Sequence, residues 1–509
     1  MSRTSMSEIQ VREDSSIHSH NPQDDYLEID SQEGEPDDEY PEGGSRAYLV
    51  LVGSFIGLIA NFGMLNSVGA IQTYISMNQL SSVKSSTVSW IFSIYFALAY
   101  FGGIVVGPFF DVRGATIPLV GGLILIVGGF IAVANCTSVW QFILSLSLCV
   151  GIGNALCITP LVGVISHWFY LKRGRAIGLA TTGGSVGGII IPLMLRGLYP
   201  KVGFSWAIRI LALFSLVCMV ISIVLAKGRL SLVQREKSKE KSSTKTKKKK
   251  SVPGNIDSAD KASSVITTTS PPLTPTDDIS LHTLTENRHE SSPANKFKNL
   301  IGGKDVRYFN FANLLDVKYS LLIAGVFTEE LSLMLIVTYF ASYAIAQNVS
   351  ESNSYLLLTV FNAAGVPGRW LPGYASDIIG HFNVMILMLV GLCLSIFLLW
   401  LPFGSNHGVL WAFSVLGGFF SSSILSLTPV CLGQITPVSK FGERYGMLYF
   451  FVSIGNLFGL PIGAAIIGSG SKHNYDMFVV LCGILAVVGS LCWLGSRYCI
   501  AGLQWNIKV

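Results

Sequence analysis

The sequence predicts an all-helical membrane protein with twelve transmembrane helices in two six-helix, pseudo-symmetric halves. Three observations support this. Half of the 509 residues are hydrophobic, only 13% are charged, and the mean hydropathy is +0.54, whereas soluble domains carry roughly 25% charged residues. Apolar stretches of about 20 residues, which span about 30 Å of hydrocarbon as helices, recur along the chain. A short loop motif also repeats at the same point of each half.

The apolar stretches fall into two sets of six, which predict helical halves at 47–226 and 318–497. The first set lies at 47–71, 87–108, 116–135, 139–163, 175–197 and 204–226. The second lies at 318–346, 354–374, 383–403, 409–431, 445–467 and 477–497.

Three polar segments flank and separate the halves. Residues 1–46 are acidic and are expected to be disordered, and 498–509 form a short tail. The linker 227–317 is rich in Lys, then in Ser, Thr and Pro. Its basic run, Lys247 to Lys250, is typical of a solvated linker or a contact with the inner leaflet, so no nucleic-acid partner is expected. The first apolar stretch is expected to direct insertion.

The basic residues near short loops predict the orientation. Arg113, Lys172, Lys440 and the Lys-rich linker follow even-numbered stretches, on the side where both termini also fall. Because cytoplasmic loops carry an excess of Lys and Arg, we expect both termini in the cytoplasm. The plasma membrane is the expected location, with the vacuolar membrane as the alternative.

The repeated motif pairs a glycine with an aspartate four residues later. Gly107 precedes Asp111 at the end of the second stretch, and Gly373 precedes Asp377 at the end of the eighth. We interpret each aspartate as a latch that pairs with an arginine or a helix N-terminus of a neighbour; the alternative is that it caps its own loop. The basic candidates for this gating role are Arg113, Arg173, Arg175 and Arg444.

These features resemble the major facilitator superfamily, and within it the monocarboxylate porter family. The residues that carry the resemblance are Gly107-xxx-Asp111-x-Arg113-Gly114, Glu42-Gly43-Gly44, the run from Phe169 to Ala180, and Arg369 followed by Gly373 and Asp377. The segments 368–374 and 429–435 resemble the fungal branch, which includes a plasma-membrane riboflavin transporter. The resemblance covers residues 41–505 and implies that Arg369 binds substrate.

Two departures from that family concern proton coupling. Proton-coupled members place an aspartate one turn before the arginine, where this chain has Gly365, and a lysine in the first span, where it has Asn66. Ser45 also replaces the usual aromatic residue after the Glu-Gly-Gly motif. These departures favour facilitated diffusion over proton symport.

Few ionisable residues lie in mid-membrane, where they are costly and commonly functional. Arg369 offers a planar fork for an anionic or imide group; the alternative is that it pairs with Glu329 or Glu330 in span seven. Adjacent helical residues diverge by about 100°, and we expect Glu330 to face the cavity. Further substrate-binding candidates, which helix packing equally explains, are Asn66, Asn154, Asn362, Tyr339 and Tyr343.

The sequence therefore predicts a secondary transporter that moves riboflavin or a monocarboxylate-like organic anion by alternating access. The alternatives are proton symport through Glu330 and a non-transporting nutrient sensor. No nucleophile–base pair, metal cluster or nucleotide motif stands out in the spans, so we expect neither an enzyme nor a cofactor. The expected partners are a small-molecule substrate and the lipid bilayer, with no obligate protein partner.

Overall fold

The computed structural model describes residues 40–229, 311–468, 470–502, 504 and 507–508, and every regular element among them is helical. The first half contains α2 (Ser45–Met77), α3 (Ser85–Phe101), α4 (Gly103–Arg113), α5 (Thr116–Val133), α6 (Val139–Phe142), η2 (Ile143–Val150), α7 (Gly151–Gly163), η3 (Val164–His167) and α8 (Arg173–Leu225). The second contains η4 (Phe311–Leu315), α11 (Val317–Ala346), α12 (Glu351–Ile379), α13 (His381–Leu394), η5 (Ser395–Trp400), α14 (Leu401–Phe403), α15 (His407–Gln434), η6 (Val438–Lys440), α16 (Phe441–Ile467) and α17 (Lys472–Ala501).

Ten helical stretches among the described residues are long and apolar enough to cross a membrane. One of them, α8, has 53 residues and bends at Gly203, where φ is 73° and ψ is 174°. Only glycine adopts this backbone conformation readily. Gly183 packs against the backbone of Phe55, while Gly53 packs against Leu225. Both ends of α8 therefore lie beside the same part of α2, so the chain reverses at Gly203 and α8 provides two crossings.

The helix α12 is not among the ten apolar stretches, because its polar, Gly and Pro residues lower its hydropathy. It has 29 residues and packs chiefly against α15 and α8, so it runs within the bundle. Counting α8 as two crossings and adding α12 gives twelve crossings among the described residues, the number that the sequence predicts. The described helices overrun most predicted spans by several residues, because terminal turns continue beyond the apolar stretch.

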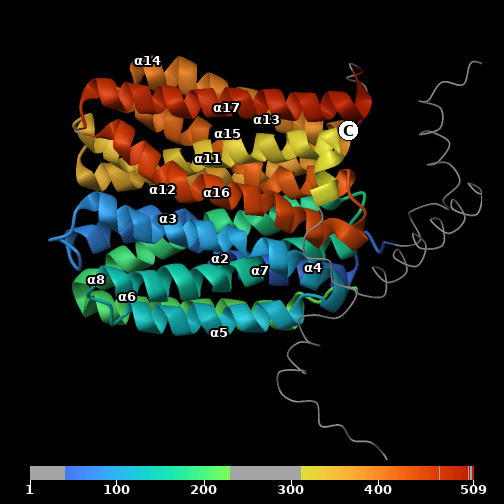
Figure 1. Ribbon diagram of the computed structural model, residues 1–509, viewed down its shortest axis with the longest axis horizontal. Helices are drawn as coiled ribbons and strands as arrows, with labels where there is room; N and C mark the ends of the chain where they lie inside the picture. The colour runs from blue at the N-terminus through green and yellow to red at the C-terminus, as the bar shows by residue number, and fades with distance from the viewer. Residues whose placement is uncertain (1–39, 230–310, 469, 503, 505–506, 509) are drawn as a thin grey trace, which may run out of the picture.

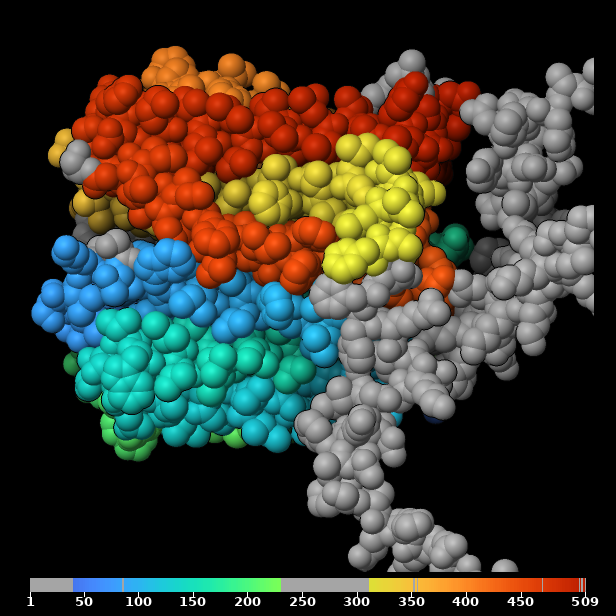
Figure 2. Space-filling view, in the orientation of Figure 1, coloured from blue at the N-terminus to red at the C-terminus, as the bar shows by residue number. Residues whose placement is uncertain are grey.

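The two halves lie side by side (Figure 1), and in Figure 2 they meet along a continuous seam on the face that is drawn. Helices α3 and α4 pack against α16, and α8 packs against α12. We call the end of the bundle that contains Arg113 and the start of α8 the latch end, and the end that contains Gly203 the open end. Helix α17 ends at the latch end, on the side of α4 in Figure 1.

Parts of the predicted polar segments lie outside the described residues, namely 1–39 and 230–310. Within the described part of the linker, Phe311–Leu315 forms a short 3-10 helix just before α11. Leu315 is 83% exposed, so this turn lies on the surface of the second half.

Candidate functional site

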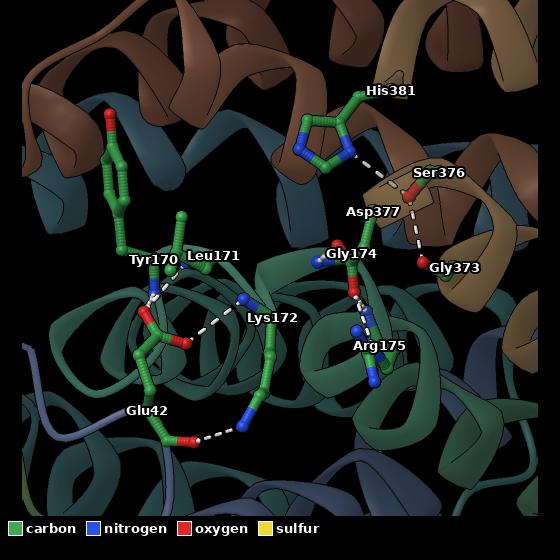
Figure 3. A network of polar contacts seen from close by, with 10 residues as sticks. All are labelled: Glu42, Tyr170, Leu171, Lys172, Gly174, Arg175, Gly373, Ser376, Asp377 and His381. Carbon is green, nitrogen blue, oxygen red and sulfur yellow. Dashed lines mark hydrogen bonds and ion pairs between the residues drawn. The ribbon is translucent and has the colours of Figure 1, made fainter. Parts of the chain in front are cut away.

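Asp377 joins the two halves at the latch end. Its Oδ1 accepts a hydrogen bond from the backbone N–H of Gly174 at 2.8 Å, and its Oδ2 accepts from the N–H of Arg175 at 3.0 Å. The Arg175 Nε also donates to Oδ2 at 3.0 Å (Figure 3). The Arg175 guanidinium lies over the Tyr374 ring, 4.8 Å from its centroid. The end of α12 is thereby bound to the first turn of α8.

Asp111 makes the pseudo-symmetric contact at the end of α4. Its Oδ1 accepts from the N–H of Gly442 and its Oδ2 from the N–H of Glu443, both at 2.9 Å. The backbones come very close here, because a β-carbon on Gly107 would collide with the carbonyl of Gly442. Glycines at these positions let two helices approach to backbone contact.

The two aspartates occupy equivalent places on the helices that they cap. The first N–H groups of a helix have no partner within the helix, and a capping side chain normally accepts from them. The residues that precede α8 and α16 are Lys172 and Lys440, and neither makes a side-chain cap. An ammonium group has no acceptor. An aspartate from the opposite half therefore supplies each cap, and it also interacts favourably with the helix dipole.

The basic gating candidates lie in different surroundings. The Arg173 guanidinium lies 5.5 Å from the Tyr170 ring centroid and reaches Gly433 at the end of α15, so it also crosses between the halves. Arg113 is in the last turn of α4. Arg444 stays within the second half, since it pairs with Asp316 at 3.5 Å and donates to the Ile435 carbonyl at 3.2 Å. The structure therefore does not bring Arg444 to the contact between the halves.

Arg369 lies at the interface between α12 and α8. It is 2% exposed, and its Nη1 donates to the carbonyl of Thr181 at 2.6 Å. The same nitrogen lies close to Gly184, where a β-carbon would stand 2.8 Å away. The guanidinium thus bridges the halves in the middle of the bundle, and its Nε has no hydrogen-bond partner.

Glu330 lies in a buried cluster with Arg369 and three tyrosines. Electrostatic interactions connect its carboxylate with Arg369, Tyr449, Tyr445 and Tyr100. Tyr100 of the first half stacks on Tyr449 of the second, with ring centroids 5.0 Å apart. The Tyr449 hydroxyl interacts with both the Glu330 carboxylate and the Tyr445 hydroxyl, although none of these groups, nor the Tyr100 hydroxyl, makes a hydrogen bond of ordinary geometry. Buried polar groups are rarely left unpaired, so this cluster has capacity for a polar molecule.

The sequence did not point to these tyrosines. Tyr445 and Tyr449 lie one turn apart on α16, and Tyr100 is at the end of α3. The available signal for a polar site was the pair of hydroxyl-bearing residues one helical turn apart inside an apolar stretch. Aromatic core packing produces the same pattern.

Glu329 points in another direction from Glu330. It lies against Gly489 of α17, and its Oε1 is 3.3 Å from the Ser490 hydroxyl. It is therefore enclosed within the second half, and among the described residues neither glutamate forms an ion pair with Arg369. The expectation that Glu330 faces the cavity stays a prediction, because Glu330 lies at the contact between the halves and is not among the residues that line the cavity described below.

Asn66, Asn362 and Tyr339 lie near the boundary between the halves. Asn66 donates to the Gly184 carbonyl at 3.0 Å, and Asn362 donates to the Leu358 carbonyl at 3.2 Å. A β-carbon on Gly188 would lie 2.8 Å from Asn66 and 3.0 Å from the Asn362 Oδ1. The Tyr339 hydroxyl donates to the Leu460 carbonyl at 2.7 Å and also interacts with Ser89 of α3.

Two of the substrate-binding candidates, Asn154 and Tyr343, lie inside one half and not between the halves. Their placement corrects the expectation from sequence that they bind the solute. Asn154 is 1% exposed and donates to the Tyr95 hydroxyl at 2.5 Å, between α7 and α3. Tyr343 packs edge-on against Trp400 and Tyr475 in the core of the second half. Helices that are apolar all round do not reveal which face meets the partner half.

A cavity of about 390 Å³ lies between α2, α8 and α12, on the open-end side of Arg369. Its lining is mainly apolar, with aromatic and polar side chains among it, including Tyr74, Tyr199, Thr73, Asn362 and Arg196. Tyr74 and Tyr199 stack with centroids 3.6 Å apart. The volume is within the range of about 300–1,000 Å³ for small-molecule sites. Asn362 and Gly188, which line the cavity, lie beside Asn66. Asn66 in turn contacts Gly184, which lies next to Arg369.

Gly365 has little space around it. A β-carbon there would collide with the Ser422 hydroxyl and lie 2.9 Å from the Ser185 hydroxyl. A carboxylate at this position would therefore require α12, α15 or α8 to shift. The missing aspartate is thus accompanied by closer packing of these helices.

Comparison with known proteins identifies the family. A family model described as Major Facilitator Superfamily matches residues 51–371 and 322–498. The chain belongs to this superfamily. Its small-solute transport function follows from that membership and from its relatives. The solved structure of a bacterial homologue of the iron transporter ferroportin in an outward-facing state shares the fold, with a TM-score of 0.58 and 11% identity over 89% of this chain and 100% of the other.

The curated relatives of this chain include fungal transporters. The riboflavin transporter MCH5 of Saccharomyces cerevisiae is 35% identical over 476 residues, which are 92% of this chain and 81% of the relative. The Fujikurins efflux protein of Gibberella fujikuroi is 27% identical over 91% of this chain and 84% of its own length. MFS-type transporter 1 of an Ophiocordyceps species is 28% identical over 75% of this chain and 70% of its own length.

Proposed function

We propose that this protein carries riboflavin, or a planar organic solute of similar polarity, across the plasma membrane by alternating access. The observation that carries the proposal is the 35% identity with a riboflavin transporter over 92% of the chain. The cavity supports it, because stacked tyrosines, amides and a single arginine suit a flat molecule with a polar edge. None of its lining residues is acidic, which disfavours a cationic solute.

In the proposed cycle the described structure is the latch-closed conformation. Solute enters the cavity from the open end and moves past Asn362 and Asn66 toward Arg369, Glu330 and the three tyrosines. When the caps by Asp111 and Asp377 separate, the halves rock apart at the latch end and release the solute there. Arg369 must then give up its bond to the Thr181 carbonyl, so the arginine takes part in both solute binding and the contact between the halves.

The proposed orientation places the latch end in the cytoplasm with both termini. The support is the concentration of basic residues there, among them Arg113, Lys172, Arg173, Arg175 and Lys440. An epitope placed at residue 1 or at residue 509 should require permeabilised cells for detection. Surface staining of intact cells would contradict this orientation.

We propose facilitated diffusion as the transport mode, since Gly365 and Asn66 replace the titrating pair of proton-coupled relatives. One observation favours a second candidate, proton symport through Glu330: its carboxylate is fully buried and interacts with the Tyr449 hydroxyl and with the charge of Arg369. Under facilitated diffusion the Glu330→Gln variant still equilibrates solute, whereas under symport it loses accumulation that follows the proton gradient.

The test is uptake of labelled riboflavin by a riboflavin-requiring yeast that lacks its own transporter, at clamped internal and external pH. We expect saturable uptake that stops at equal internal and external concentrations, and no uptake by the Arg369→Ala variant. A competition panel of monocarboxylates and planar heterocycles measures selectivity. The absence of uptake and of efflux of riboflavin, in cells where the protein reaches the surface, would overturn the proposed substrate.

A further inference from the structure

Two short segments hold the loops on which the latch aspartates dock. We call Tyr40–Gly44, which precedes α2, the first brace. The Glu42 carboxylate accepts hydrogen bonds from the backbone N–H groups of Tyr170 at 2.6 Å, Leu171 at 2.7 Å and Lys172 at 3.1 Å. The Lys172 Nζ donates in return to the Glu42 carbonyl at 3.2 Å (Figure 3).

The loop before α8 therefore lies between two carboxylates. Figure 3 shows Glu42 bound to Tyr170, Leu171 and Lys172, and Asp377 bound to Gly174 and Arg175 farther along the same segment. Glu42 belongs to the same half as this loop, whereas Asp377 comes from the opposite half. The first contact can therefore persist while the second breaks and reforms.

The geometry of Glu42 is itself unusual. Its φ is 47°, which is uncommon for a residue other than glycine. Such strained conformations concentrate where the surrounding structure imposes them for function. The Tyr40 ring adds a second contact, because it stacks on Tyr170 with centroids 5.3 Å apart.

The second half repeats this arrangement with different residues. We call Phe311–Asp316, which precedes α11, the second brace. Asn313 donates to the Glu443 Oε1 at 2.9 Å, and Asp316 pairs with Arg444 at 3.5 Å. Glu443 supplies one of the N–H groups that Asp111 caps. In each half, the segment before the first helix thus holds the start of the fifth helix.

We propose that the two braces are positioning elements that fix these helix starts for the latch aspartates and so set the fraction of molecules that is latch-closed. A loop with free N–H groups samples many conformations, and capping must then fix it at an entropy cost. A braced loop has already lost that freedom, so the aspartate of the other half docks on a preformed site. This inference rests on the proposed alternating-access cycle, but not on the identity of the solute.

The test measures which end of the protein is open, without any solute. One reporter is Ser376→Cys, because Ser376 is 1% exposed and packs against Gly174 at the latch. The other is Thr73→Cys in the open-end cavity. Each is labelled with a small thiol reagent in nanodiscs, and the labelling of the matched protein without the reporter is subtracted because nine native cysteines are present.

We expect Glu42→Ala to raise the labelling rate of Ser376→Cys by about threefold to tenfold and to lower that of Thr73→Cys, since the population moves toward the latch-open state. Glu42→Gln, which keeps one acceptor, should have a smaller effect in the same direction. Asn313→Ala should act similarly through α16. Asp476→Asn, which removes a carboxylate near the opposite end of the bundle, is the matched control and should leave both rates unchanged.

Asp377→Asn separates the possible failures. If Asp377→Asn shifts both reporters and the Glu42 variants shift neither, the brace is not a positioning element and the inference is wrong. If Glu42→Ala lowers thermal stability but leaves the ratio of the two labelling rates unchanged, its role is only structural and the inference is again wrong. If Asp377→Asn also has no effect, the latch itself, and with it the proposed cycle, is wrong.

Discussion

Replacing Arg369 tests the centre of the proposed pathway. In Arg369→Ala the 2.6 Å charge-assisted bond to the Thr181 carbonyl is lost, which costs about 1.5–3 kcal/mol. Glu330 also loses the positive charge nearest to it. Removing one partner of a buried ion pair costs about 3–5 kcal/mol. That figure is an upper bound here because the two groups form no direct ion pair.

A companion substitution separates stability from transport. Glu330→Gln removes the uncompensated carboxylate while keeping its size, so the double variant should recover the electrostatic part of the loss and retain only the cost of the Thr181 bond. Riboflavin uptake should be absent from both the single and the double variant. Lost binding of about 3 kcal/mol corresponds to a reduction of roughly a hundredfold in affinity.

Two measurements decide the outcome. Thermal unfolding of purified protein in detergent gives the order of stability, and uptake per surface-exposed molecule gives transport. If the double variant is no more stable than Arg369→Ala, Glu330 and Arg369 are not electrostatically coupled. If either variant transports normally, Arg369 is not in the pathway.

Three further predictions concern the latch and the helix packing. Asp111→Asn should increase thiol labelling at the latch end as Asp377→Asn does, because an amide replaces the carboxylate that caps α16. Labelling of Asp111→Asn that stays at the level of the parent protein would contradict the pseudo-symmetry. Gly203→Ala should destabilise the protein by about 1–3 kcal/mol from backbone strain alone, since nothing lies within 4 Å of the added carbon, and Gly197→Ala, equally open but helical, should not lower the melting temperature. Gly365→Asp should reduce the yield of folded protein in size-exclusion profiles, and Ser422→Ala should partly restore it.

Much of the fold could be predicted because lipid imposes a simple rule on sequence. A span needs about 20 apolar residues, so the helices were found with errors only at their ends. Gly203 was not singled out, although a glycine between two apolar stretches allows the reversal within α8. The Arg369-bearing helix α12 was predicted despite its Pro and Gly residues, since both are common in transmembrane helices.

The candidate site was harder to predict than the helices. Asp377 and Asp111 could be paired with helix starts because their spacing repeats in register. Tyr343 and Asn154 were misplaced because an all-apolar helix gives no indication of which side meets the other half. Tyr100 and Tyr449 come from different halves, and their stacking depends on how α3 and α16 cross, which no local pattern records.

The lysines that precede α8 and α16 have a consequence for how this carrier changes shape. Had Lys172 or Lys440 been serine or aspartate, each helix would satisfy its own first N–H groups and would gain little from the other half. With lysine there, the donors are satisfied either by the opposite aspartate or by water, and those two options differ by only a modest free energy. Two residues that cannot accept a hydrogen bond thus make closure dependent on the partner half while keeping it reversible.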